Sequence, residues 1–416
     1  MAINIPELRQ KFKNPGVPEL DLIARYASLP EDERRGRMFD AFAKTGLPGR
    51  RNEGWRWSDV ETAAARLDGA EAPAVTPALL QPDDATVFNL SPAGLEAPDR
   101  LPDGLLVHRL QAAPALAGSE NIPMAALAGS LCQYKDDAAS IVFEVTASLP
   151  APVYINWRGH DGDTNFSRIA IIVRQGAKLD LVESYCGGAS LASTLVELKL
   201  EDEADVRRSL FHAGDAREIM TATGLVELAA KARFSQTILS LGSLLSRFET
   251  RLNHTGSGSH AVLNAAYLCA AQRHCDITSV VRHGAPSCVT RQMTKGAVLA
   301  GGRGVFQGKF LVPRTIGQFT DADMQHQALL LENGAEVFAK PELEIYADDV
   351  ECAHGNTSGA LDEEQLFYMR QRGIPLPQAR ALLTEAFVSE ALSAASPDVG
   401  EAMQTTARAF LAEMHG

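Results

Sequence analysis

Hydrophobic and polar residues alternate through the long middle part of the chain. Segments such as RIAIIVRQGAKLDLVESYCGG and STLVELKLEDEADVRRSLFHA follow one another there with few helix signals between them. Such alternation is typical of β-strands that bury one face. The pattern therefore predicts a mainly β fold for this region.

A unit recurs along these strands: a small or acidic turn, an Ala or Gly, and then the alternation. It appears as QGAKLDL, EDEADVRRSL, LAAKARFSQTIL, GSGSHAVLNAAYL, AGGRGVFQGKFLV and ENGAEVFAKPELEI. The first apolar residues of the units are 27, 28, 28, 43 and 32 residues apart, at Leu179, Val206, Phe234, Val262, Val305 and Val337. A nearly constant period predicts a β-solenoid, whose coils bury their inner faces by stacking. The 43-residue step breaks the series and leaves a β-sandwich as the alternative.

Helix signals stand at both ends of the chain. Near the start, Pro30 precedes three acidic residues, and Gly46 follows an apolar stripe, as a helix start and stop would. Near the end, Asp362 with Gln365 predicts a helix N-terminus, and Gly373 predicts its C-terminus. Both ends are therefore predicted to be helical.

These signals divide the chain into four regions. We expect a helical region over residues 1–70, a linker with the first strands over 71–139, the solenoid over 140–355, and a second helical region over 356–416. The alternate tryptophans Trp55 and Trp57, in the first region, are expected in the core, with a partner surface as the alternative.

Composition narrows the functional classes. The chain has 416 residues and a net charge of -13, which argues against nucleic acid as a partner. The N-terminal stretch does not resemble an export signal, and no apolar run is long enough to cross a membrane, so we expect a cytoplasmic protein without membrane contact. The six cysteines are scattered and form no C-x-x-C pair, which favours buried free thiols over a disulfide framework or a four-cysteine site.

Most familiar catalytic motifs are missing. GGRGVFQGKF has neither the first glycine nor the final hydroxyl of a P-loop, and H-E-x-x-H and G-x-S-x-G are absent. Four histidines are dense in one segment, at His254, His260, His274 and His283. They could line a metal groove, but core or surface positions are favoured because alternating strands need not bring them together.

One short stretch offers ligand chemistry, IYADDVECAHGNTSG, with Cys352 and His354 two positions apart. In an extended segment such residues face the same side. Thiolate and imidazole both bind iron or zinc, but two ligands are too few for a closed site. Two hypotheses therefore remain open. In the first, a partner completes a metal site that Cys352 and His354 begin. In the second, Cys352 is a buried cysteine and His354 caps the turn. A β-helix enzyme acting on carbohydrate is a third hypothesis, with Asp321 and Asp323, or Asp348 and Asp349, as carboxylates.

The same residues carry a family resemblance. The stretch from Lys340 to Ile374, KPELEIYADDVECAHGNTSGALDEEQLFYMRQRGI, resembles the C-terminal signature of the SufD family, scaffold subunits of the Suf iron–sulfur cluster assembly system. EGWRW near the start and the total length also agree. Two positions depart from the family pattern: Asn356 stands where alanine is usual, and Gln371 where serine is usual. Neither departure removes a candidate ligand.

The resemblance implies a right-handed parallel β-helix between N-terminal and C-terminal helical parts. It implies a non-catalytic scaffold that pairs with a SufB-like subunit and docks a SufC-like ATPase, with no tightly bound cofactor and a transient cluster in the complex. His354, and with it Cys352, is then a candidate metal ligand at the SufB interface. The residues implied for ATPase docking are Leu366, Phe367, Tyr368, Leu382, Leu383 and Phe387. A purely structural docking role is the alternative, and unpaired edge strands favour a homodimer when the partner is absent.

Overall fold

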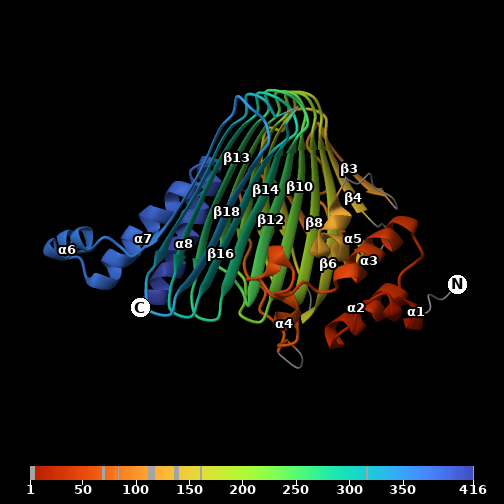
Figure 1. The fold of residues 1–416 in the computed structure, drawn as a ribbon, viewed down its shortest axis with the longest axis horizontal. Coiled ribbons are helices and arrows are strands. Elements are labelled where there is room, and N and C mark those ends of the chain that lie inside the picture. Colours follow the sequence, from red (N-terminus) through yellow and green to blue (C-terminus); the bar gives the residue numbers. More distant parts are fainter. Residues whose placement is uncertain are drawn as a thin grey trace.

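The computed structural model describes residues 5–67, 71–79, 81–82, 84–110, 118–134, 140–159, 162–314 and 317–415. Parts of the expected linker, residues 111–117 and 135–139, lie outside this range. Two sheets, parallel except for the pairs β1–β2 and β3–β4, form a β-solenoid with helices on both outer faces (Figure 1). The predicted solenoid is therefore confirmed, and the β-sandwich alternative is wrong.

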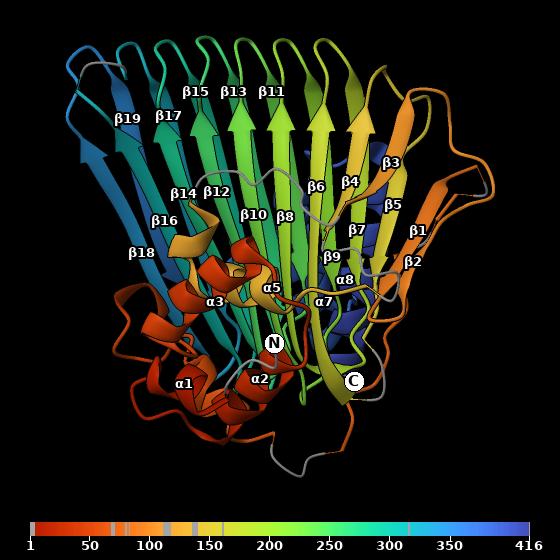
Figure 2. The ribbon, with the colours of Figure 1, turned by 90° about the vertical axis from the view of Figure 1, so that its right-hand side faces the viewer.

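Strands alternate between the two sheets along the chain. The first sheet has ten strands in the order β19-β17-β15-β13-β11-β9-β7-β5-β1-β2, and the second has nine in the order β18-β16-β14-β12-β10-β8-β6-β4-β3. The early strands are β1 (Thr86–Ser91), β2 (Gly94–Glu96), β3 (Leu105–Leu110), β4 (Ser140–Val145), β5 (Val153–Trp157), β6 (Gly162–Val173), β7 (Lys178–Tyr185), β8 (Ala189–Leu200) and β9 (Asp205–His212). The later strands are β10 (Ile219–Leu228), β11 (Arg233–Ser240), β12 (Leu245–His254), β13 (His260–Cys269), β14 (His274–His283), β15 (Val289–Val298), β16 (Arg303–Val312), β17 (Asp321–Leu330), β18 (Glu336–Ile345) and β19 (Glu351–Gly359). Figure 2 shows them stacked in chain order across the solenoid.

The register explains the imperfect repeat in the sequence. Leu179, Val206 and Phe234 are neighbours in one ladder of the first sheet, as predicted. Val262 is one position out, because Phe234 pairs with Ala261. Val305 and Val337 belong to the second sheet. The anomalous step of 43 residues therefore comes from joining positions of two different sheets, and the true ladder is regular.

The corners of the solenoid repeat with the same period. From β7 onward, one residue in each turn before a strand of the first sheet has a positive φ: Gly176, Glu203, Lys231, Gly258, Ser287, Phe319 and Asp349. Successive turns are joined by backbone hydrogen bonds, such as Glu203 N–H to Ala230 O at 2.9 Å and Lys231 N–H to Ser257 O at 3.0 Å. The left-handed conformation costs a non-glycine residue about 1 kcal/mol. The ladder of turn bonds offsets this cost, so five of the seven corners need no glycine.

Helices cover the outer faces of both sheets. The N-terminal helices are α1 (Ile5–Gln10), α2 (Val17–Ala27), α3 (Glu33–Thr45), the 3-10 turn η1 (Glu53–Trp55) and α4 (Val60–Ala64). A further helix, α5 (Pro123–Leu131), follows the 3-10 turn η2 (Ser119–Asn121) and packs between α3 and strands β6 and β8. α5 was not predicted from the sequence. Its Ala-rich, almost wholly buried sequence has no polar face, so it lacks the periodicity that marks a surface helix.

The C-terminal helices are α6 (Glu363–Gln371), α7 (Leu376–Leu392) and α8 (Pro397–His415). Asp362 caps α6 by accepting hydrogen bonds from the N–H groups of Glu364 and Gln365, and Gly373 follows the helix with a φ of 84°. Both predicted boundary signals are thus confirmed. α7 and α8 lie against the first sheet, whereas α6 contacts mainly α7 and extends away from the solenoid (Figure 1).

Candidate functional site

Cys352 ends a ladder of inward-facing side chains. Its strand β19 pairs with β17, and Cys352 stands opposite Ala322. The same ladder continues inward through Thr290, Ala261 and Phe234, all of which are buried. Because paired residues in a parallel sheet point to the same side, Cys352 faces the inside of the solenoid at its last coil.

His354 ends the neighbouring inner ladder. It stands opposite Met324, which is fully buried, and below Met324 the ladder continues through Gln292 and Leu263. His354 itself is exposed, and Cys352 is half-buried. Cys352 and His354 therefore share one inner face of the solenoid, as their i and i+2 spacing predicts. They differ from the other residues of their ladders only because no further coil covers them.

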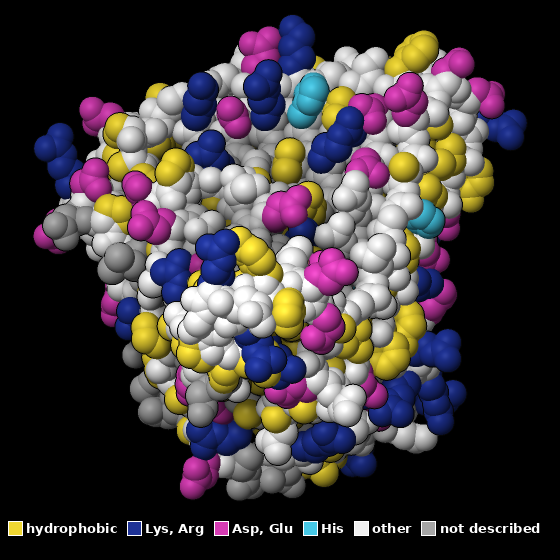
Figure 3. Space-filling view, turned by 90° about the vertical axis from the view of Figure 1, so that its left-hand side faces the viewer, with side chains coloured by type: hydrophobic (Ala, Val, Ile, Leu, Met, Phe, Trp, Pro, Cys, Tyr) yellow, Lys and Arg dark blue, Asp and Glu magenta, His cyan; other side chains and the backbone are white. Residues whose placement is uncertain are grey.

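This end of the solenoid is open. β18 and β19 are the last strands of their sheets, so each has a free edge. Val337, Ala339 and Leu343 face inward from β18 onto the core, yet they remain only partly buried. Figure 3 shows the side of the molecule that carries the C-terminal helices, where hydrophobic side chains lie among acidic and basic ones. Half-buried core positions beside two free edges are typical of a surface that a further coil would cover.

β19 also differs from the expectation for its sequence. The solenoid was expected to end at residue 355, but residues 356–359 continue the strand to Gly359. Asn356 stands opposite His326, and its side-chain oxygen accepts a hydrogen bond from His326 Nδ1 at 2.7 Å. His326 Nε2 in turn lies 2.9 Å from the hydroxyl of Tyr267. This chain of contacts ties the free strand to the buried interior and explains why it stays extended.

The surroundings of Cys352 disfavour the form of its side chain that binds metal. Burial, with a smaller contribution from the carboxylate of Asp321, raises the pKa of the Cys352 thiol. A thiol binds metal as thiolate, so Cys352 must lose its proton when it binds. Within the described part of the chain, no cluster of three or more His, Cys, Asp or Glu side chains is arranged to hold a metal ion. Cys352 and His354 alone are therefore too few to hold a metal ion.

The dense histidines do not converge on a groove. His254 and His283 stack at 5.0 Å inside the solenoid, and both place Nε2 near the hydroxyl of Thr290, at 3.0 and 2.9 Å. His274 is buried beside Ser58, whereas His260 is exposed. Core and surface positions were the favoured prediction, and the structure confirms them.

The candidate carboxylates are already engaged or lie apart from the interior. Asp321 pairs with Arg291 at 2.5 Å, and Asp323 accepts a hydrogen bond from Gln325 at 2.9 Å. Asp348 and Asp349 are exposed in the turn before β19. Neither pair lines a cavity among those identified in the described part of the chain, so the arrangement does not favour glycoside chemistry.

The segment around the two tryptophans covers the outside of the second sheet, and we refer to residues 49–64 as the N-terminal clasp. Trp55 is buried beneath the guanidinium of Arg247, 3.9 Å from its ring centre. Trp57 stacks on Phe338 of β18 with ring centres 5.7 Å apart, and Glu53 pairs with Lys340 at 2.9 Å. The core placement predicted for the tryptophans is confirmed for Trp55, whereas Trp57 is half-buried. The clasp covers the outer face of β18 around Phe338 and Lys340.

The residues expected to dock an ATPase fall into two groups. Phe367 and Tyr368 on α6 are 63% and 59% exposed, and Leu382 on α7 is 40% exposed. Leu366 is buried, while Leu383 and Phe387 are half-buried. The ring of Phe387 lies 4.5 Å from the ammonium group of Lys295 on β15, so it helps to fix α7 to the solenoid.

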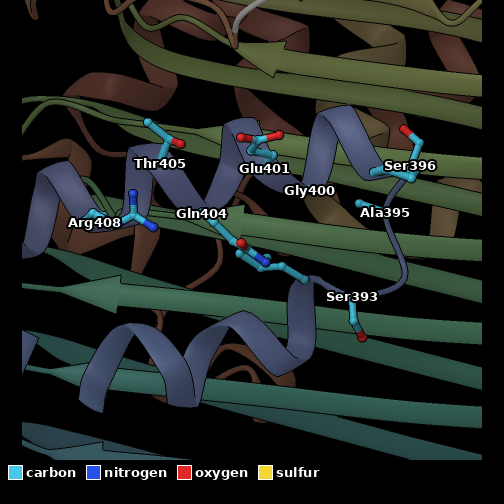
Figure 4. A pocket seen from close by; sticks show the side chains of 10 residues that line it. Ser393, Ala395, Ser396, Gly400, Glu401, Gln404, Thr405 and Arg408 are labelled. Atoms are coloured by element: carbon cyan, nitrogen blue, oxygen red, sulfur yellow. The ribbon is translucent and has the colours of Figure 1, made fainter. Parts of the chain in front are cut away.

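A hollow of about 410 Å³ lies where α7 turns into α8 (Figure 4). Ser393, Gln404 and Arg408 line it, but Arg408 is held by Glu385 at 2.6 Å. Its one lining cation is therefore neutralised, and the other charged side chain that lines the hollow, Glu401, is acidic. In the described residues, no helix is both long enough and apolar enough to span a bilayer.

Comparison with known proteins gives a consistent result. A family model described as the SufBD core domain of SUF-system FeS cluster assembly matches residues 156–387, more than half of the chain. The iron–sulfur cluster assembly protein SufD of Escherichia coli (strain K12) is 38% identical over 175 residues, which cover 42% of this chain and 41% of that protein. A SufBD family protein of Synechocystis sp. is 30% identical over 273 residues, covering 62% of this chain and 59% of the relative. The chloroplastic protein ABCI7 of Arabidopsis thaliana is 28% identical over 254 residues, covering 58% and 53%. The chain thus matches about two fifths to three fifths of these relatives' own lengths.

Proposed function

The chain belongs to the SufBD family of iron–sulfur cluster assembly proteins, and we propose that it is a non-catalytic scaffold subunit that contributes ligands to a nascent cluster. The observation that supports this most is the position of Cys352 and His354. Both end inner ladders of the solenoid at its uncovered last coil. The cluster is the cargo of this reaction and would leave for other proteins.

The missing ligands would come from a SufB-like partner. Free edges on β18 and β19, with half-buried Val337, Ala339 and Leu343 between them, suit a partner that adds the next coil. Such a coil would bring its own side chains within reach of Cys352 and His354. In the absence of the partner, a second copy of this chain would pair through the same edges. We place this assembly in the cytoplasm, as the sequence predicts.

The two ligands have unequal roles in this proposal. His354 is exposed at the mouth of the last coil, and imidazole binds metal in its neutral form without losing a proton. Cys352 is half-buried, and its thiol has a raised pKa, so it must be deprotonated first. His354 is therefore the principal ligand and Cys352 the supporting one.

Replacing His354 by alanine is expected to reduce cluster assembly in a complementation assay at least about tenfold, because a site with few ligands loses one of them. The side chain is exposed, so folding and association with partners should be unchanged. Thr357→Ala is the matched control, since Thr357 lies on the same strand and faces the opposite side. Full complementation by the His354 variant would refute the ligand role, as would a loss of assembly that accompanies dissociation of the complex.

We further propose that α6 and the start of α7 dock a SufC-like ATPase. Phe367 and Tyr368 are large apolar side chains exposed on a helix that extends away from the solenoid (Figure 1). Aromatic side chains of this kind are common anchors at protein interfaces. The alternative function, a purely structural docking subunit without ligands, rests on this same surface and would remain if the His354 prediction failed.

Changing both Phe367 and Tyr368 to aspartate is expected to abolish co-purification of the ATPase. The substitution places two charges where the partner would bury apolar surface, while the isolated fold loses no core contact. Gln365→Ala on the same helix is the control, because Gln365 is exposed and polar. Retention of the ATPase by the double variant, measured at equal protein levels, would place the docking surface elsewhere.

A further inference from the structure

Arginines converge where the N-terminal clasp meets the turns that precede β14, β16 and β18. Two adjoining hollows of about 470 and about 360 Å³ lie there, and we refer to them together as the arginine groove. Both hollows are lined by Arg50 of the clasp and Arg303 of β16. The larger adds Arg66 and Arg273, and the smaller adds Arg56. Figure 1 shows α4, at the C-terminal end of the clasp, beside the ends of strands of the second sheet.

The charge of the groove is unusual for this chain. The whole chain has a net charge of -13, yet five arginines and one acidic residue, Glu336, line the groove. Glu336 is paired with Arg303 at 2.5 Å, and Asp59 beside the groove lies 3.4 Å from Arg50. In the part of the chain that the structure describes, the side chains of Arg56 and Arg66 have no ion-pair or hydrogen-bond partner. The groove therefore holds uncompensated positive charge.

Two of these arginines are held in place. Arg273 donates to the backbone carbonyl of Gly242 at 2.8 Å and lies 5.8 Å from the ring centre of Phe410. Arg303 lies 5.5 Å from the ring centre of Phe338, in addition to its pair with Glu336. Cations fixed in this way lose little side-chain freedom when an anion binds, so they are suited to recognition.

The smaller hollow also has an aromatic wall. Trp57 of the clasp and Phe338 of β18 line it, and their rings stack with an angle of 17° between the planes. Such a wall offers contact to a flat or apolar group. Charge and aromatic surface thus lie side by side, joined by the shared Arg50 and Arg303.

We propose that the arginine groove binds a phosphorylated small molecule that carries a flat ring. Its phosphoryl oxygens would lie at the junction of the hollows, near Arg50 and Arg303, and its ring in the smaller hollow against Trp57 and Phe338. Guanidinium groups match the geometry of phosphate oxygens through paired N–H donors. The hollows are also within the size range of small-molecule sites, which is roughly 300–1,000 Å³. An acidic segment of another protein would use the charge but leave the aromatic wall without a role.

Calorimetric titration of the full chain with ADP and with inorganic pyrophosphate tests this proposal. Both probes are expected to bind saturably, ADP several-fold more tightly because its ring adds contacts. The double variant Arg56→Gln/Arg66→Gln is expected to weaken both at least about tenfold, since each lost charge removes part of the phosphate attraction. Neither side chain has a partner in the described structure, so folding should be unaffected. Arg37→Gln is the control, because Arg37 is an exposed arginine on α3, paired with Glu33.

Several results would overturn the proposal. Absence of saturable binding of either probe would do so, as would equal binding by the double variant. Equal affinities for ADP and pyrophosphate would show that a flat ring contributes nothing to binding in the groove. Binding of a polyglutamate peptide without binding of ADP would instead make the groove a docking site for an acidic protein segment.

Discussion

Lowering the pH from 7 to 5 is expected to reduce the free energy of unfolding by several kcal/mol. Among the described residues, four histidines are buried without a charge partner. Burial lowers the pKa of His254 and His274 to about 3, and that of His283 and His326 to about 4. In the unfolded chain each returns to a pKa of about 6.5. Between these values the unfolded state binds protons that the folded state does not.

The sign of the effect follows from this difference in proton binding. A histidine whose pKa is lowered by folding costs no stability above about pH 6.5. Below that pH, the free energy of unfolding falls until the pH reaches the pKa of the histidine in the folded state. Over two pH units each histidine costs about 2 kcal/mol, because one unit of difference is about 1.4 kcal/mol. The combined cost of four such histidines approaches the free energy of unfolding of a typical domain, which is about 5–15 kcal/mol. Acid unfolding is therefore expected well above the folded pKa values.

Denaturant midpoints at pH 7, 6 and 5 measure this effect. The double variant His254→Gln/His283→Gln is expected to be less stable at pH 7 but to lose only about half as much stability on acidification. Glutamine keeps a donor near Thr290, which both imidazoles contact. His260→Gln is the control, since His260 is exposed and should leave the slope unchanged. A wild-type midpoint that stays constant from pH 7 to 5 would contradict the prediction.

The period of the solenoid was readable from the sequence because every coil must bury the same inner positions. Leu179, Val206 and Phe234 are rungs of one ladder, and spacing alone identifies them. The ladder could not be followed to its end, because Ala261 and Thr290 occupy later rungs where no large apolar residue marks the position. The last rung is Cys352, so the repeat and the candidate ligand belong to one pattern.

The candidate site could be predicted only in part. The shared side of Cys352 and His354 follows from strand geometry, but their inward direction and the open end depend on pairing across the whole sheet. The clasp and the arginine groove were not predictable, since Arg50 and Arg303 lie far apart in the chain and meet only through tertiary packing. The extension of β19 past Asn356 was also missed, because its cause is a contact with His326, thirty positions earlier.

Replacing the buried Arg208 by methionine is expected to destabilise the protein by about 3–5 kcal/mol, because a buried carboxylate would lose its counter-charge. Arg208 is 1% exposed in the interior and donates to Glu183 at 2.6 Å and to Gln236 at 3.1 Å. Glu183 is fully buried and would keep only two neutral donors, the indole N–H of Trp157 at 3.1 Å and the hydroxyl of Tyr185 at 2.9 Å.

The adjacent arginine provides a matched control for this prediction. Arg207 faces the outside, pairs with Asp180 at 3.5 Å and has a side chain that is 46% exposed, so Arg207→Met should cost less than about 1 kcal/mol. Adding Glu183→Gln to Arg208→Met should recover about 2 kcal/mol, since the uncompensated charge is then removed. Denaturant midpoints of the four proteins measure these differences. If the Arg208→Met variant were no less stable than the Arg207→Met variant, water would have to reach Glu183 inside the solenoid. Such a result would disprove the closed core on which the inner ladders depend.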